Sequence, residues 1–179
     1  MKQSALSLIG PGIRLRLLKY EDLPLTLKWR NTEDIRCQFI NSDIISKDRH
    51  LKWWEKYREK NNDFIFIIQD TERLSRSVGQ VSLYNINLEK RVAEYGRLMI
   101  GDSKTREKGL ARRSTDLLLI WAFNTLRIER IYLEVFKDNI SALNLYLQCG
   151  FVSYGERGKL LLMSISKKAS SNMHEGIKE

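Results

Sequence analysis

The segment Thr105-Arg106-Glu107-Lys108-Gly109-Leu110-Ala111-Arg112-Arg113 decides how the rest of the chain is interpreted. It follows a strand-like run, Arg97 to Ile100, and precedes a helical pattern from Ser114 to Leu126. Gly109 and Ala111 are small, so a ligand can approach the backbone closely where the strand turns into the helix. The first N–H groups of a helix lack internal partners and lie at the positive end of its dipole, so such a turn can receive phosphate oxygens. Four cations belong to the same segment: Arg106, Lys108, Arg112 and Arg113.

Two motifs in this chain resemble signatures of one enzyme family. Arg106-x-x-Gly109-x-Ala111 resembles the acyl-CoA-binding signature Q/R-x-x-G-x-G/A of the Gcn5-related N-acetyltransferases (GNAT). The segment from Asn139 to Phe151 resembles the later signature of that family, N-x-x-A-x-x-x-Y-x-x-x-G-F. Taken alone, the first motif could be an ordinary helix start with solvated basic side chains, whereas two motifs in the right order are more specific. The resemblance implies an N-acetyltransferase that uses acetyl-CoA as co-substrate and needs no metal.

Composition and charge are compatible with such an enzyme. The 179 residues suit a single domain, expected over 1–166, followed by a polar tail over 167–179. The net charge of +9 favours anionic partners, among them CoA, a nucleotide-linked sugar, a nucleic acid or an anionic membrane surface, and charge alone does not choose between them. No apolar run is long enough to span a bilayer, and the apolar part of the N-terminus is too short for a signal peptide. We therefore expect a cytoplasmic protein without a membrane partner.

The order of expected elements agrees with the resemblance. Strand-like patterns cover 13–18, 64–68, 78–86, 93–100, 130–135, 152–154 and 160–165. Helices are expected from an Asp22 cap towards Asn31, over 47–60 with Ser46 as N-cap, over 114–126 and over 139–148, while 32–43 looks irregular apart from the apolar pair Phe39-Ile40. This order is that of the GNAT fold, an α/β fold with a mixed, mostly antiparallel central sheet and helices on both faces.

The resemblance assigns residues to the co-substrate. In the family, the backbone of the strand before the phosphate loop pairs with the pantetheine arm, and an N–H there supports the thioester carbonyl. The residues assigned in this way to CoA binding are Leu98, Met99, Ile100, Arg106, Lys108, Gly109, Leu110, Ala111 and Asn139.

Two side chains are candidates for the catalytic proton transfers. Tyr146 matches the family tyrosine that protonates the departing thiolate, a role that a phenol can fill as a general acid. Glu134, between apolar neighbours on an expected central strand, is the favoured base, and Glu94 is its competitor. Either glutamate could instead pair with an arginine.

Three features of the front half stand in order: Trp29-Arg30-Asn31, then Phe39, then His50-x-x-Trp53. Together they resemble the front half of the amino-sugar acetyltransferases of the pseudaminic acid pathway. That resemblance assigns Arg30, His50 and Trp53 to the acceptor, with Arg30 as partner of a phosphate or carboxylate. His50 and Trp53 could equally be packing residues of an amphipathic helix. The acceptor is then expected to be the primary amine of a nucleotide-linked sugar.

Several alternatives to this function stay open. A ribosomal-protein-type N-terminal acetyltransferase is the nearest alternative enzyme. A nucleic-acid-binding module and a catalytically silent sensor of acyl-CoA are weaker alternatives, because no RNA-binding signature is present and Tyr146 is retained. The sequence also allows a homodimer.

Overall fold

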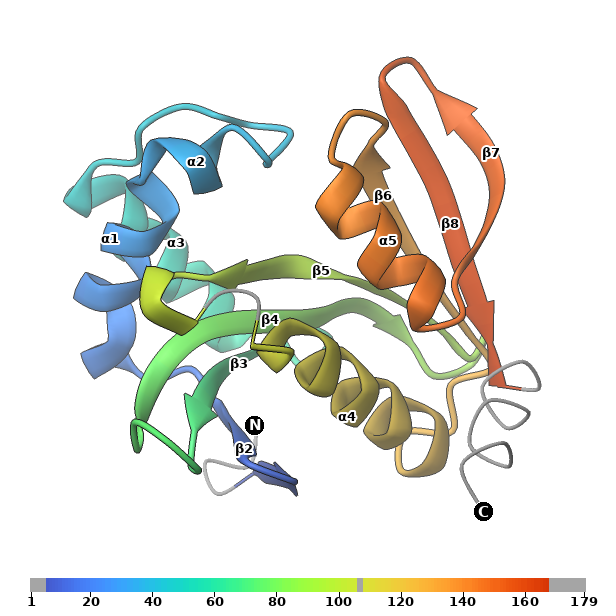
Figure 1. Ribbon diagram of the computed structural model, residues 1–179, viewed down its shortest axis with the longest axis horizontal. Helices are drawn as coiled ribbons and strands as arrows, with labels where there is room; N and C mark the ends of the chain where they lie inside the picture. The colour runs from blue at the N-terminus through green and yellow to red at the C-terminus, as the bar shows by residue number, and fades with distance from the viewer. Residues whose placement is uncertain (1–5, 106–107, 168–179) are drawn as a thin grey trace.

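One mixed sheet runs through the computed structural model, which describes residues 6–105 and 108–167 (Figure 1). Its eight strands lie in the order β1-β2-β3-β4-β5-β6-β8-β7. Every neighbouring pair is antiparallel except β5 and β6, which are parallel. The strands are β1 (Ser7–Gly10), β2 (Ile13–Leu17), β3 (Phe64–Asp70), β4 (Arg76–Asn87), β5 (Val92–Ile100), β6 (Arg130–Phe136), β7 (Val152–Arg157) and β8 (Leu160–Ser166). The predicted mixed, mostly antiparallel sheet is confirmed.

Helices cover both faces of this sheet, as predicted. The helices are α1 (Leu23–Asn31), α2 (Glu33–Arg36), α3 (Lys47–Glu59), α4 (Leu110–Asn124) and α5 (Ile140–Gln148), with 3-10 turns at Tyr20–Asp22 and Ser103–Thr105. On one face, Trp121 of α4 meets Phe64 and Phe66 of β3 edge-on, with ring centroids 5.5 Å apart in both pairs. On the other face, Ile65 and Ile67 of β3 are buried against α1 and α3. Strand β3 is therefore covered on both sides, which explains its almost continuous apolar sequence.

A third apolar cluster joins the first two helices to β5. It contains Trp29 of α1, Ile35 of α2 and Met99 of β5. The indole of Trp29 lies directly on Gly101, where an added Cβ would come within 2.0 Å of the ring. Because only glycine allows this approach, Gly101 lets α1 pack close to the end of β5.

Helix α4 begins at Leu110, four residues before the predicted start at Ser114. Gly109 is its N-cap residue, with a left-handed backbone (φ 72°) that glycine adopts without strain. The basic residues Arg112 and Arg113 therefore belong to the first turn of the helix and not to the loop before it. This correction brings the N-terminal N–H groups of α4 directly to the Gly109 turn.

Three other differences concern the N-terminal half of the chain. The edge strand β1 was not predicted, because it is short and largely accessible on both sides. Helix α2, a single turn, lies inside the segment predicted to be irregular. Asp22 is the N-cap residue of α1, as predicted, but its carboxylate makes no cap hydrogen bond and accepts from Arg16 and from the Lys19 N–H instead. The predicted Ser46 cap is confirmed by a bond of 3.2 Å from the Arg49 N–H.

Strands β5 and β6 separate after a short parallel ladder. They pair only from Val92 to Glu94 on β5 and from Arg130 to Tyr132 on β6, whereas β6 pairs with β8 along its whole length. Beyond Glu94, no strand of the described residues pairs with the edge of β5 that faces β6. In Figure 1 the unit of β6, β7, β8 and α5 inclines away from β5 above this ladder.

The described residues contain neither a membrane-spanning helix nor a cluster of metal-binding side chains. None of their helices is long and apolar enough to cross a membrane. Across 6–105 and 108–167, no three His, Cys, Asp or Glu side chains come together in a group that could hold a metal ion.

Candidate active site

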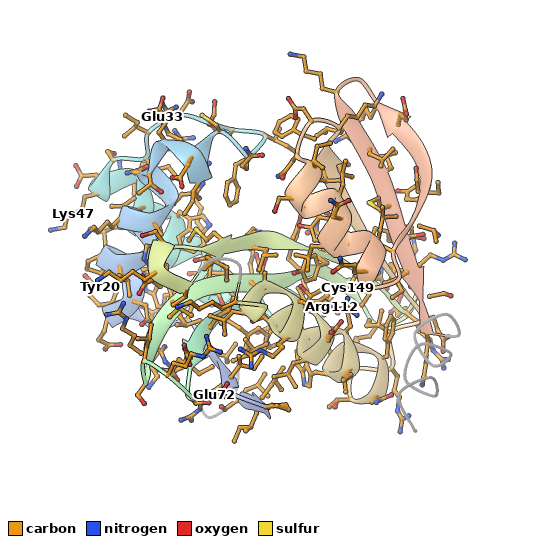
Figure 2. The ribbon with its side chains drawn as sticks, viewed as in Figure 1. Tyr20, Glu33, Lys47, Glu72, Arg112 and Cys149 are labelled. Carbon is orange, nitrogen blue, oxygen red and sulfur yellow. The ribbon has the colours of Figure 1, made fainter. Side chains whose placement is uncertain are left out.

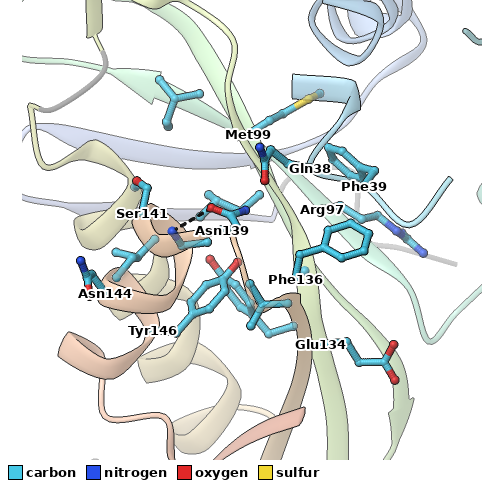
Figure 3. A pocket seen from close by; sticks show the side chains of 18 of the residues that line it. Gln38, Phe39, Arg97, Met99, Glu134, Phe136, Asn139, Ser141, Asn144 and Tyr146 are labelled. Atoms are coloured by element: carbon cyan, nitrogen blue, oxygen red, sulfur yellow. Dashed lines mark hydrogen bonds between the residues drawn. The ribbon is translucent and has the colours of Figure 1, made fainter. Parts of the chain in front are cut away.

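A cavity of about 720 Å³ occupies the region where β5 and β6 separate (Figure 3). Its wall combines β5, the start of α4, the end of β6, α5 and the segment that follows α2. Ten residues predicted to belong to the site line it: Arg30, Leu98, Met99, Ile100, Gly109, Leu110, Ala111, Glu134, Asn139 and Tyr146. The fold therefore brings together the two motifs on which the sequence interpretation was based.

Four other predicted site residues are not in this lining. Lys108, His50 and Trp53 are described but do not line the cavity. Arg106 lies outside the described residues, as does most of the predicted tail.

The start of α4 offers backbone donors to an anion. Gly109 has no side chain to cap the helix, and an added Cβ at this position would meet nothing within 4 Å. The N–H groups of the first turn lie at the positive end of a 15-residue helix and lack partners within it. Arg112 lines the same wall and donates from Nε to Asp116 at 2.8 Å, which fixes its guanidinium beside the cavity. Figure 2 shows Arg112 close to Cys149, where α4 meets α5. This turn has the geometry to bind phosphate.

A bulge in β5 orients two backbone donors. Met99 pairs with Gln80 and Gly96 pairs with Ser82, so Arg97 and Leu98 together oppose a single residue of β4. The Ser82 hydroxyl donates to the Gly96 carbonyl at 3.0 Å, and the Gln80 amide donates to the Arg97 carbonyl at 3.5 Å. In a trans peptide the N–H points opposite to the preceding carbonyl. The N–H groups of Arg97 and Leu98 therefore point away from β4, towards the edge that β6 leaves open.

Tyr146 is buried in an aromatic cluster on the α5 side of the cavity. Its ring meets Tyr95 and Phe151 edge-on at centroid distances of 5.8 Å. The Tyr95 hydroxyl is in turn bonded to the Thr115 hydroxyl at 2.7 Å, which holds that neighbouring ring in place. Burial, followed by the charges of Cys149 and Tyr84, raises the pKa of Tyr146 above its ordinary value. The phenol therefore keeps its proton over the physiological pH range, as a proton donor must.

Asn139 starts helix α5 at the mouth of the cavity. Its side-chain oxygen accepts a hydrogen bond of 3.1 Å from the Ala142 N–H, drawn dashed in Figure 3, so Asn139 caps the helix. With the oxygen used in this way, the side-chain amide N–H₂ is the group that could bond a ligand.

The two candidate bases lie in different environments. Glu134 lines the cavity, but its carboxylate accepts a bond of 2.6 Å from Arg157, and in Figure 3 it points away from Tyr146. Glu94 is not in the lining, and its carboxylate accepts a bond of 3.0 Å from the Asn85 amide. Neither glutamate directly faces the phenol of Tyr146.

Arg30 forms part of the wall next to α2. Its guanidinium lies 4.1 Å above the Phe39 ring, and Nη2 donates to the Asn41 carbonyl. Its Nη1 is buried and has no hydrogen-bond partner among the described residues. Burial, and then the charges of Arg36 and Arg49, lower the pKa of Arg30. This end of the cavity is therefore positively charged and has an unused donor.

His50 and Trp53 have packing contacts within the helical layer. Their rings stack with centroids 5.0 Å apart, and Trp53 stacks on Tyr57 at 5.2 Å. Burial lowers the pKa of His50, whose Nε2 lies 3.4 Å from the Thr26 hydroxyl of α1. Their predicted contact with the acceptor stays a prediction.

Sequence reasoning missed part of the cavity wall. The cavity is also lined by four residues within the segment 32–43 that was predicted to be irregular: Gln38, Phe39, Ile40 and Asn41. The apolar pair Phe39-Ile40 within a polar stretch was the available signal. Tyr84 and Arg97 also line the cavity, and no sequence motif marked them.

Comparison with known proteins agrees with this geometry. Residues 13–152 match the family model described as an acetyltransferase (GNAT) domain. The chain is 30% identical to acetyltransferase PseH of Campylobacter jejuni over 78% of this chain and 82% of that protein, and 29% identical to an N-acetyltransferase 9-like protein of Caenorhabditis briggsae over 77% and 74%. The crystal structure of spermidine N-acetyltransferase from Vibrio cholerae, in complex with CoA and spermine, superposes with a TM-score of 0.81 at 27% identity, over 90% of this chain and 99% of that one. The chain thus belongs to the GNAT acetyltransferase family and is an acetyl-CoA-dependent N-acetyltransferase.

Proposed function

We propose that this enzyme acetylates the primary amine of a nucleotide-linked amino sugar. The observation that carries the proposal is the buried, unpartnered Nη1 of Arg30 in the cavity wall. Burying a charged donor without a partner is costly, so such a group is expected to have a partner in the complex. An acceptor with a diphosphate would supply it.

The surroundings of Arg30 also favour an anionic acceptor. The positive charges of Arg36 and Arg49 lower the pKa of Arg30. Because three cations lie near one another, this end of the cavity repels other cations. The guanidinium of Arg30 is already stacked on Phe39, which leaves its planar edge for a forked contact with phosphate oxygens. The similarity to PseH, which matches the resemblance of the front half to amino-sugar enzymes, supports the same acceptor class.

The chemistry of transfer can be assigned to residues of the cavity. The acceptor nitrogen attacks the thioester carbon, and the Arg97 and Leu98 N–H groups stabilise the negative charge that develops on the carbonyl oxygen. The C–S bond then breaks, and Tyr146 gives its proton to the departing sulfur. The proton lost by the nitrogen leaves to solvent, and Tyr146 is reprotonated. Asn139 holds the pantetheine arm, and the α4 start with Arg112 holds the pyrophosphate.

A panel of primary amines tests the acceptor class. The purified protein is incubated with acetyl-CoA and one of three acceptors: a nucleoside-diphosphate amino sugar, spermidine or a peptide with a free N-terminus. Products are identified by mass spectrometry. We expect efficient acetylation of the nucleotide sugar alone. Preferred acetylation of spermidine or of the peptide would contradict the proposal.

The variant Arg30→Ala tests whether the acceptor binds to the buried Nη1 of Arg30. A charge-assisted hydrogen bond contributes about 1.5–3 kcal/mol, so KM for the nucleotide sugar should rise roughly 10- to 150-fold. KM for acetyl-CoA should change little. Arg30→Lys should recover only part of the loss, because an ammonium group cannot reproduce the forked contact.

The control is Arg58→Ala, which removes an exposed arginine of α3 that pairs with Glu55 and does not line the cavity. It should leave both Michaelis constants unchanged. If Arg30→Ala lowered the melting temperature without a selective effect on the acceptor, Arg30 would be a structural residue.

A further inference from the structure

Gly96 lies at the opening between β5 and β6. It is two residues beyond Glu94, the last residue of β5 that pairs with β6. Because Gly96 has no side chain, nothing from β5 fills the space above it. An added Cβ at Gly96 would lie 3.1 Å from the Tyr84 hydroxyl. The position is therefore filled by the phenol of a residue from the neighbouring strand β4.

Tyr84 and Tyr146 both line the cavity, and they reach it from opposite sides of the sheet. Tyr146 comes from α5, on the face covered by α4, where it contacts Tyr95. Tyr84 neighbours Leu83 on β4, and Leu83 belongs to the α4-facing core, so Tyr84 points to the opposite face. Both residues contribute to the wall of the same cavity, and the charge of Tyr84 adds to the burial that raises the pKa of Tyr146. An acceptor amine next to the thioester would meet Tyr146 on the CoA side and Tyr84 on its own side.

Tyr84 is the cross-strand neighbour of Glu94. The two residues are directly paired across β4 and β5, so their side chains lie on the same face. Burial, followed by the charge of Glu94, raises the pKa of Tyr84 to about 12. Glu94 itself is not in the cavity lining, whereas Tyr84, its cross-strand neighbour, does line the cavity.

Other charges face this pair from the neighbouring elements. Arg97 of β5 lies 4.2 Å above the Tyr84 ring and is held by a bond of 2.8 Å to Asp63, and its charge lowers the pKa of Tyr84. The charge of Glu134 of β6 raises the pKa of Tyr84, more weakly than the charge of Glu94 does. Asn85 donates a hydrogen bond to the Glu94 carboxylate. The charges of Glu134 and Glu94 both raise the pKa of Tyr154 of β7. Within the described chain, Tyr84 is therefore the contact between the cavity and Glu94.

We propose that Tyr84 is a catalytic residue that relays the proton of the acceptor ammonium to the carboxylate of Glu94. One N–H bond of the ammonium breaks as its proton moves to the Tyr84 oxygen, while the proton of the Tyr84 hydroxyl moves to Glu94. The tyrosine ends neutral, the carboxylate ends protonated, and the acceptor ends as the free amine that attacks the thioester. Glu94 then releases the proton to solvent. The relay does not depend on the identity of the acceptor.

This assignment makes Glu94 the final proton acceptor, whereas the sequence favoured Glu134 over Glu94 as the base. Glu134 would have to break its contact of 2.6 Å with Arg157 to accept a proton, and its carboxylate points away from Tyr146 (Figure 3). Glu94 needs no such change, because its bond from Asn85 leaves further acceptor positions on the carboxylate. In this proposal Glu94 acts through Tyr84 and is a positioning residue.

The variant Tyr84→Phe tests the relay, because it removes the hydroxyl and keeps the ring on which Arg97 stacks. The substrate is the amine of the panel above that is acetylated fastest, and kcat/KM is measured against pH. At pH 7 we expect a loss of ~10²-fold, the scale of a general acid–base contribution. The loss should shrink towards high pH, where the acceptor is already a neutral amine.

Glu94→Gln should show the same pH-dependent loss, because the amide still accepts from Asn85 but cannot take up the proton. The double variant should lose no more than either single variant, as expected for two residues that act in one step. Tyr154→Phe is the matched control: it removes a hydroxyl from the same face of the sheet, at a residue that is exposed and outside the cavity lining.

Affinity for acetyl-CoA and the melting temperature should be unchanged in all of these variants. A loss that is the same at every pH would indicate a structural role and overturn the relay. Near-normal activity of Tyr84→Phe together with a pH-dependent loss in Glu134→Gln would assign the base to Glu134. Either result would leave the acceptor class, which is tested through Arg30, unaffected.

Discussion

Tyr146 combines two properties that a proton donor to sulfur needs. Its hydroxyl belongs to a residue that lines the cavity, and burial raises its pKa so that it stays protonated at neutral pH. The same burial makes the phenolate unfavourable, so the proton must return quickly after each transfer. Tyr146 is therefore protonated when the thiolate forms in the same desolvated cavity, and it can serve as the proton donor there.

Replacement of Tyr146 by Phe should reduce kcat by ~10²-fold or more, the usual scale for a general acid. KM for acetyl-CoA should change little, because the ring and its contacts with Tyr95 and Phe151 are kept. The measurement is a rapid-mixing experiment under conditions where the chemical step limits the rate. Turnover close to that of the unmodified enzyme under these conditions would remove Tyr146 from the mechanism.

The residues of this site differ in how visible they are in the sequence. Tyr146 and Asn139 were predicted because they belong to a motif with fixed spacing on one helix. Tyr84 had no such mark, because its role depends on strand pairing with Glu94 and on the missing side chain of Gly96. Arg30 was predicted from resemblance alone, and its unused Nη1 is visible only once its surroundings are known. Contacts between strands that are distant in sequence cannot be read from local patterns.

At the scale of elements, the turn into α4 is the feature on which CoA binding should depend most. The backbone at Gly109 is left-handed, and the space around its missing side chain is open. A side chain there would project into the volume in front of the first turn, where the pyrophosphate is expected.

Gly109→Glu should therefore lower the affinity for CoA at least about tenfold, because a carboxylate would repel the phosphates at close range. Calorimetric titration with CoA measures the effect. The substitution also carries a backbone cost of roughly 1–2 kcal/mol, since a side chain disfavours the left-handed conformation.

Gly158→Glu is the matched control for that cost. Gly158 has a similar backbone (φ 59°) and equally open surroundings, but it lies in the turn between β7 and β8, outside the cavity. Both variants should lose a similar amount of stability, and only Gly109→Glu should lose CoA affinity. Equal CoA affinities in the two variants would show that the α4 turn does not hold the pyrophosphate.

Prediction of the elements succeeded where hydrophobic periodicity was strong. The apolar run of β3 and the alternating β4 and β5 were found, because burial imposes their patterns. The start of α4 was misplaced because its first turn carries Arg112 and Arg113, which lack an apolar periodicity: Arg112 lines the cavity, and Arg113 pairs with Glu72. The Asp22 carboxylate makes no cap hydrogen bond because a nearby arginine competes for it, and Arg16 is six residues away on another element. Rules for helix caps that consider only neighbouring residues do not include such a competing arginine.

At the scale of the whole molecule, the separation of β5 from β6 divides the sheet into two parts. Beyond the short ladder from Val92 to Glu94, no β5–β6 pairing is present in the described residues. A ligand lying in this opening contacts β5 and α4 on one side and β6 and α5 on the other, since all four contribute to the cavity wall. The order of elements predicted the fold, but the extent of the separation depends on where the ladder ends, which no sequence pattern indicated.

Bound CoA should therefore stabilise both parts of the sheet together. A ligand at 100 times its Kd that binds only the folded state adds ~2.7 kcal/mol to the free energy of unfolding. For a chain of this size each kcal/mol raises Tm by about 2–4 °C, so the shift should be roughly 5–10 °C. Differential scanning calorimetry with increasing CoA measures it. An RNA oligonucleotide at the same phosphate concentration should give no comparable shift, and a larger shift with RNA would favour the nucleic-acid-binding alternative.

Hydrogen exchange then distinguishes CoA that contacts both parts of the sheet from CoA that contacts one part alone. If CoA spans the opening, amides of Leu98–Ile100 on β5 and of the first turn of α5 should become protected together, although they lie on different sides of it. The Gly109→Glu variant at the same CoA concentration should lose protection in both segments in parallel, because one binding event causes both. Protection confined to β5 and α4, with α5 unchanged, would mean that the pantetheine arm does not reach Asn139 and that Tyr146 cannot be next to the thioester.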